Sequence, residues 1–153
     1  MPRDEKEEEM ANARQVVERH IAAFNAKDRD AEPWSADADF VTPGGRFEGR
    51  EQVLGFLKVY WDAFPDARLE ITRSIEDGEL ATVEGMMIGT QTGALQTPDG
   101  EIPPTGRGVQ IRWMSMYEVR GDEIASEHLY FDQVELMTQL GVMPGAPAEQ
   151  AAS

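Results

Sequence analysis

Apolar residues recur at every third or fourth position in three stretches of the chain, which predicts three amphipathic helices. The first runs from about residue 11 to 26, and the second runs from near Arg50 to Pro65, which ends it. A shorter helix is predicted over 134–141, with Gly141 at its C-cap. Polar residues occupy the other side of each stretch, so each helix is expected to cover a core with one face.

Elsewhere the apolar spacing drops to two, the period of a half-buried β-strand. Asp77-Gly78 is typical of a tight hairpin turn, and Gly85 and Gly89 inside a predicted strand indicate that the strand bends. Residues 93–108 form a predicted Gly/Pro-rich loop. Helices followed by hairpin-linked strands predict an α+β fold, in which a curved antiparallel sheet under the helices encloses a pocket. The predicted strands cover residues 39–42, 69–75, 80–92, 109–120 and 123–132.

Charge and length restrict the partners and the organisation of the protein. The 153 residues carry 14 Lys and Arg against 29 Asp and Glu, a net charge of −15 that repels nucleic acid and anionic membranes. The sequence has neither a signal peptide nor an apolar run of membrane-spanning length, which predicts a cytoplasmic protein. We expect one domain over residues 11–143, with disordered tails at 1–10 and 144–153.

The residues offer little for a metal or a covalent intermediate on sulfur. There is no cysteine, and the two histidines, His20 and His128, lie far apart in the sequence. A zinc site would need both of them and a carboxylate. We therefore expect no metal and no other cofactor.

Alternation along the last strand places His128, Tyr130 and Asp132 on one face and Ala125, Glu127, Leu129 and Phe131 on the other. If the first face is internal, a histidine, a phenol and a carboxyl group line the pocket, and Asp132 and His128 are the catalytic candidates. Asp132 equally fits the N-cap of the final helix, because Glu135 follows three residues later, as in a capping box. The pattern also leaves open which face of strand 109–120 is internal.

The predicted substrate contacts combine large apolar side chains, which suit a planar hydrophobic ligand, with polar groups that can hold carbonyl oxygens. They are Tyr130, His20, Phe24, Trp34, Tyr60, Trp61, Gln91, Gln110, Arg112 and Met114.

Five short motifs between about Val16 and Gly141 resemble the SnoaL-like polyketide cyclases, also called ester cyclases, of the nuclear transport factor 2/ketosteroid isomerase superfamily. The motifs are Phe64-Pro-Asp66, Gly89-Thr-Gln-Thr-Gly93, Ile102-Pro-Pro-Thr-Gly-Arg107, Gly121-Asp-Glu-Ile124 and His128-Leu-Tyr-Phe-Asp132 leading to Gln139-Leu-Gly141. The resemblance implies a cone-shaped sheet and an aspartate that faces the cavity from the end of the last long strand. That aspartate, here Asp132, would be the general acid and base of an intramolecular aldol closure of a polyketide-like substrate.

Two other functions compete with a cyclase. An epoxide-opening hydrolase of the same superfamily would need a second carboxylate and an arginine around a water, and Arg112 with Asp132 supplies part of that set. A carrier would bind a hydrophobic ligand without reaction. Apolar residues expected on the outer face of the sheet, Val83, Leu129 and Phe131, predict a homodimer or homotetramer.

Overall fold

The computed structural model describes residues 12–143, so the tails predicted at 1–10 and 144–153 lie outside the described residues. The three predicted helices are present as α2 (Ala13–Ala26), α3 (Arg50–Ala63) and α4 (Gln133–Leu140). The strands are β1 (Trp34–Thr42), β2 (Gly45–Glu48), β3 (Arg68–Asp77), β4 (Leu80–Thr90), β5 (Leu95–Thr97), β6 (Gly100–Ile102), β7 (Gly108–Arg120) and β8 (Glu123–Phe131).

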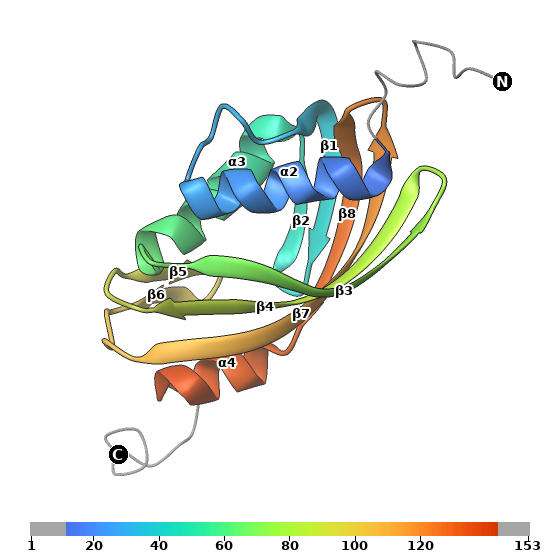
Figure 1. Cartoon of the computed structure of the whole chain (residues 1–153). Coiled ribbons are helices and arrows are strands. Elements are labelled where there is room, and N and C mark those ends of the chain that lie inside the picture. Colours follow the sequence, from blue (N-terminus) through green and yellow to red (C-terminus); the bar gives the residue numbers. More distant parts are fainter. Residues whose placement is uncertain (1–11, 144–153) are drawn as a thin grey trace, which may run out of the picture.

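Six strands form one curved sheet in the order β2-β1-β8-β7-β4-β3, and β5 and β6 form a separate hairpin. The α+β class and the curved sheet are confirmed (Figure 1). The sheet is mixed, however, because β1 pairs in parallel with β8. The alternation of apolar and polar residues does not show whether two neighbouring strands run parallel or antiparallel. No hairpin links β1 and β8, so no turn fixes their relative direction either. The loop predicted at 93–108 contains the β5–β6 hairpin, whose strands of three residues are too short to show a period.

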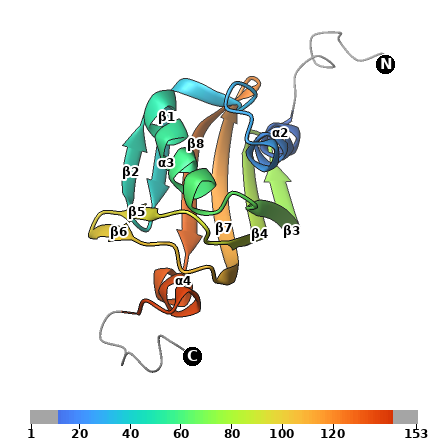
Figure 2. The same cartoon turned by 90° about the vertical axis from the view of Figure 1, so that its left-hand side faces the viewer.

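The two long helices lie over one face of the sheet, and α4 packs next to β7 (Figures 1 and 2). Helix α2 packs on β3 and β7, whereas α3 packs on β1, β2 and β5. Asn12 and Gln15 form a capping box that satisfies backbone donors at the start of α2. Side-chain caps therefore support α2 and α4, whereas α3, which begins after Gly49 without a side-chain cap, depends on the apolar face that it turns to the sheet.

The structure decides which faces of β7 and β8 are internal. Along β7 every second residue from Val109 to Val119 is buried, and the residues between them are exposed. On β8 the internal set is Ala125, Glu127, Leu129 and Phe131, because Glu127 pairs in register with Tyr117 and Phe131 with Trp113. Val83, Leu129 and Phe131 thus belong to the inner face, and their predicted position on the outer face was wrong.

No helix within residues 12–143 is long and apolar enough to cross a membrane.

Candidate functional site

An apolar pocket lies between the inner face of the sheet and the helices, with a volume of about 80 Å³. Seven of its fifteen lining residues are Phe, Tyr or Trp, supplied by both long helices and by β1, β7 and β8. An apolar cavity of about 150 Å³ holds benzene. The inner pocket as it stands therefore fits a small group rather than a whole ring system.

A larger cleft of about 960 Å³ opens beside it, between the β1–β2 turn, α3, the β5–β6 hairpin and α4. The two spaces share four wall residues, Phe56, Tyr60, Phe131 and Leu136. Phe56, Tyr60 and Phe131 are only partly buried, and their rings form the boundary between the two spaces. A ligand larger than the inner pocket would extend from it into this outer cleft.

The inner pocket contains one carboxyl group in its wall, that of Glu127 on β8. Glu127 is 3% exposed, and the Ser115 hydroxyl donates a hydrogen bond to its Oε2 over 2.5 Å. The Tyr117 hydroxyl lies near the same carboxyl group and acts to lower its pKa. Both partners lie on β7, because the register that pairs Tyr117 with Glu127 turns these side chains to the same face of the sheet.

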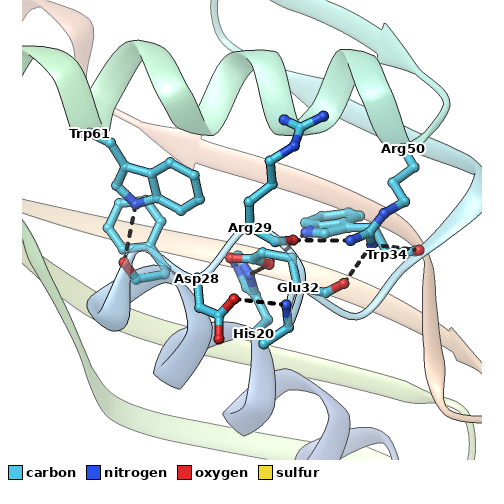
Figure 3. Close-up of polar contacts among 9 residues, drawn as sticks. His20, Asp28, Arg29, Glu32, Trp34, Arg50 and Trp61 are labelled. Atoms are coloured by element: carbon cyan, nitrogen blue, oxygen red, sulfur yellow. Dashed lines mark hydrogen bonds and ion pairs between the residues drawn. The ribbon is translucent and has the colours of Figure 1, made fainter.

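His20 on α2 lines the same pocket and is tied to a second buried carboxylate (Figure 3). Its Nδ1 lies 2.6 Å from Oε2 of Glu32, and both side chains are almost completely buried. The indole Nε1 of Trp34 donates to the same Glu32 oxygen over 2.9 Å. Glu32 precedes β1, so the turn after α2 brings this carboxylate back against the helix.

Burial and the paired charges shift the ionisation of these groups in consistent directions. Burial raises the pKa of Glu127, and the nearby Glu32 carboxylate adds to this, although His20, Ser115 and Tyr117 partly oppose it. Burial alone would lower the pKa of His20, but its hydrogen bond to Glu32 and the charges of Glu32 and Glu127 outweigh burial and raise it. Burial raises the pKa of Tyr117 well above its ordinary value, which keeps this phenol a donor. The site therefore contains a carboxyl group with a raised pKa, that of Glu127, which can give or take a proton, and an imidazole, that of His20, whose protonated form is stabilised.

Three of the predicted contacts, His20, Phe24 and Tyr60, line the pocket. Trp34 lies behind it, fully buried, with its ring edge-on to His20 at 5.4 Å between centroids. Trp61 packs against Phe24 and donates its indole hydrogen to the Phe24 carbonyl, outside the pocket wall. Gln91 is completely buried but is used by the fold, because its amide holds the loop backbone at Ile102, Pro103 and Thr105.

The expected cavity-facing positions of Asp132 and His128 were wrong. Asp132 is exposed, and its carboxylate caps α4 by accepting from the Glu135 amide at 3.1 Å. His128 lies on the outer face of β8, in register with Met116, and Tyr130 on the same face is 62% exposed. The capping alternative describes Asp132 correctly, since a residue that follows a strand and starts a helix leaves the inner face there.

The outer face of β7 holds the remaining predicted contacts, which do not reach the pocket. Gln110, Arg112 and Met114 are all exposed there. Their strand alternates with the apolar set Val109, Ile111 and Trp113, and the sheet turns the apolar set inward because helices cover that face. Arg112 is therefore not available to the buried carboxylates, and the arginine that a hydrolase would need is missing from the pocket wall.

The sequence prediction missed Glu127 and Glu32. A signal for Glu127 exists, because it lies between Ala125, Leu129 and Phe131 on one strand face, whose other charged residue, Glu123, stands at the strand's first position. A carboxylate on an apolar face is either paired or functional, since burial of an isolated charge is costly. Glu32 lies in a polar turn between Asp30 and Trp34, and nothing in that stretch indicates burial. Trp113, another missed pocket residue, has a buried Nε1 with no partner within residues 12–143.

Comparisons with known proteins agree on the family and the fold. Residues 17–127 match the family model described as SnoaL-like domain. A candidate SnoaL-like polyketide cyclase from Jannaschia sp. CCS1 superposes with a TM-score of 0.75 at 20% identity, over 96% of this chain and 99% of that one. No curated protein matches the sequence at a significant level.

Two further solved structures share the architecture. IdmH, a candidate polyketide cyclase from Streptomyces antibioticus, has a TM-score of 0.73 and 24% identity over 86% of this chain and all of its own. TerC, crystallised with polyporic acid, has a TM-score of 0.67 and 16% identity over 85% of this chain and 98% of its own. At these identities the likeness shows the fold.

Proposed function

The chain belongs to the SnoaL-like domain family, and we propose that it is a cofactor-independent enzyme that transfers protons within a hydrophobic, carbonyl-containing ligand. The proposed reaction is an intramolecular aldol-type ring closure or a related enolisation. The general acid and base is Glu127, which takes the role that the sequence alone assigned to Asp132. The neighbours' description as candidate polyketide cyclases supports this reaction class.

One observation carries the proposal: the Glu127 carboxyl group is buried in the wall of an apolar pocket. Burial raises its pKa, so its carboxylate is a stronger base than an exposed glutamate. A carbon next to a carbonyl group loses a proton to such a base if the resulting enolate is stabilised. The electron pair of the C–H bond moves into the new C=C bond, and the carbonyl π pair moves onto oxygen.

The enolate carbon then attacks a second carbonyl group, and a C–C bond forms. Glu127, now protonated, gives its proton to the oxygen that becomes the alcohol. The carboxylate is regenerated, and no oxidant or reductant is consumed. The reacting carbonyl would occupy the inner pocket, and the remainder of the ligand would lie in the outer cleft, because the inner pocket alone is too small. TerC binding polyporic acid, a ring-containing ligand, supports this class of substrate.

The test follows proton removal directly and uses 2-tetralone, a bicyclic ketone with acidic hydrogens beside its carbonyl group. Replacement of these hydrogens by deuterium in D₂O is followed by proton NMR. The protein is expected to accelerate this exchange, and Glu127→Gln is expected to reduce the acceleration about a hundredfold or more. Glu118→Gln, at an exposed position on the outer face of β7, is the matched control and should not change it.

Exchange that is equally fast in Glu127→Gln would overturn the proposal. Binding of the ketone without accelerated exchange in the wild-type protein would instead favour a carrier of hydrophobic ligands. An epoxide hydrolase is disfavoured because Arg112 lies on the outer face, away from both buried carboxylates.

We further propose that the protein self-associates through the outer face of the sheet and acts in the cytoplasm. Met114 and Met116 on β7 are 45% and 52% exposed, and Tyr130 beside them on β8 is 62% exposed. A group of large apolar side chains exposed on a sheet is typical of an interface. A homodimer covers this face with a second copy, and a homotetramer would need another interface besides it.

A further inference from the structure

Only one of the two ring nitrogens of His20 is hydrogen-bonded to another side chain of the described residues. Nδ1 is taken by Glu32 at 2.6 Å, and Nε2 has no hydrogen-bond partner within residues 12–143. The side chain is 3% exposed and lines the pocket. A carboxylate at Nδ1 keeps a proton on that nitrogen, so Nε2 is the atom at which His20 gains or loses its proton.

One oxygen of the Glu32 carboxylate is bound by two side chains. Its Oε2 accepts from His20 and from the indole of Trp34, while its Oε1 is buried without a partner in the described part of the chain. Glu32 lies in the turn after α2, and the Arg50 guanidinium holds this turn in place. The guanidinium donates hydrogen bonds to the backbone carbonyls of Arg29, Glu32 and Trp34 (Figure 3). A buried carboxylate with one oxygen unsatisfied needs a cation nearby, and the imidazolium of His20 is the cation that this arrangement supplies.

The groups around His20 come from four segments of the chain. Glu32 lies in the turn after α2, Trp34 on β1, Tyr117 on β7 with its ring centroid 6.2 Å away, and Glu127 on β8. Glu32 and Glu127 are the charged groups among them, and both are acidic. The surroundings therefore favour a protonated His20 next to the carboxyl group that removes the substrate proton.

We infer that His20 is a second catalytic residue, whose Nε2–H donates to the ligand oxygen on which negative charge develops, and that Glu32 and Trp34 are its positioning residues. This inference rests on the proposed function of Glu127. When Glu127 removes the proton beside a carbonyl group, the electron pair of the C=O bond moves onto the carbonyl oxygen. Nε2 of His20 then donates its proton to that oxygen. When the C=O bond re-forms, the proton returns to Nε2. The substrate must then have a carbonyl oxygen and an adjacent C–H on neighbouring sides of the pocket.

Such a pair requires ionised Glu127 together with protonated His20, so the exchange rate of 2-tetralone should rise and then fall with pH. Glu32→Gln removes the charge that holds the proton on His20 and moves the falling limb to lower pH. We expect its rate at pH 8 to be about tenfold or more below that of the wild-type protein. The rising limb should also move to lower pH, by less, because the Glu32 charge contributes to the raised pKa of Glu127. Trp34→Phe should move the falling limb in the same direction by less. Trp61→Phe is the control. It also removes an indole hydrogen bond, but that bond is made to the Phe24 carbonyl and not to Glu32, so the falling limb should not move.

Proton NMR of the imidazole rings gives a readout that is independent of catalysis. The chain has two histidines, so His128→Gln assigns both sets of signals. We expect His20 to titrate above pH 6.5 in the wild-type protein and lower in Glu32→Gln. His20→Gln alone leaves Glu32 buried without its cation, so the double variant His20→Gln/Glu32→Gln keeps a folded comparison and should lose most of the exchange activity.

The outcomes separate the two proposals. Undiminished exchange in Glu127→Gln overturns the proposed function. If Glu127→Gln loses exchange, the role of Glu127 stands and that of His20 is judged separately. The role of His20 is then overturned by full exchange in the double variant, or by a falling limb that does not move in Glu32→Gln.

Discussion

The indole ring of Trp113 lies directly against the backbone of Gly85, its partner in the β4–β7 register. A Cβ added to Gly85 would be 2.5 Å from the Trp113 ring and 2.4 Å from the carbonyl oxygen of Glu70. Contacts this short do not occur between real side chains, so the glycine provides the space in which a pocket-lining tryptophan lies flat on the sheet. Opposite Gly85, the pairing of β3 shifts register between Ile71 and Arg73.

Gly85→Ala is expected to destabilise the protein by about 2 kcal/mol or more and to alter the emission of Trp113, because either the ring or the backbone of β3 must move. Gly55→Ala is the control, since an added Cβ on α3 meets nothing within 4 Å. That change should instead stabilise the helix by about 0.5–1 kcal/mol. Urea unfolding followed by tryptophan fluorescence measures both, and a neutral Gly85→Ala would contradict the contact.

Asp132→Ala is expected to lower stability by about 1 kcal/mol through loss of the α4 N-cap, while exchange of 2-tetralone continues at the wild-type rate. Asp132→Asn retains a capping oxygen and should remain near wild type in both respects. The measurements are urea unfolding and deuterium exchange. A folded Asp132→Asn protein without exchange activity would return the catalytic role to Asp132.

Gln91→Ala should cost about 2–4 kcal/mol, because four hydrogen bonds to residues 102–105 disappear and buried backbone groups are left unsatisfied. The exposed Gln96, whose amide donates to Glu101, gives the comparison, and Gln96→Ala is expected to change stability by less than about 0.5 kcal/mol. Thermal unfolding of the two variants side by side tests this. Equal effects would mean that the loop does not depend on Gln91.

Stability should fall as pH rises from 5 to 8. The folded-state pKa values of both His20 and Glu127 are raised, so the stability they contribute is complete below their unfolded values of 6.5 and 4.5. It is lost as pH rises through the folded values, and each pKa unit of displacement corresponds to about 1.4 kcal/mol. Asp66, whose pKa is lowered by the amide of Thr90, acts only at lower pH. Glu127→Gln should flatten the slope of unfolding free energy against pH, and a slope identical to wild type would show that Glu127 does not titrate in this range.

Met116→Glu is expected to convert a dimer into a monomer in sedimentation velocity experiments, because the new charge lies within the exposed apolar group on the outer face of the sheet. Gln52→Glu adds the same charge on α3, on the opposite side of the sheet, and its side chain still offers an oxygen to the Glu48 amide. This control should remain dimeric. A wild-type protein that sediments as a monomer at micromolar concentration would refute the proposed interface.

The local features of the fold could be predicted because they depend on neighbours in the sequence. The helices, the Asp77-Gly78 hairpin and the long strands follow from periods, caps and turns, each of which involves residues a few positions apart. The parallel pairing of β1 with β8 could not be predicted in this way, since it joins segments that are distant in sequence. The α+β class was accessible from the order of elements, but the mixed sheet was not.

The site shows the same division more sharply. The sequence by itself determined that His20, Phe24 and Tyr60 belong to apolar helix faces, and these residues do line the pocket. Only the tertiary structure decided between Glu127 and Asp132, because alternation states that they lie on opposite faces and says nothing about which face the helices cover. The tertiary structure also decided that Glu32 contacts His20. A turn between two elements has no periodic pattern, so the burial of its side chains depends on the segments that pack against it.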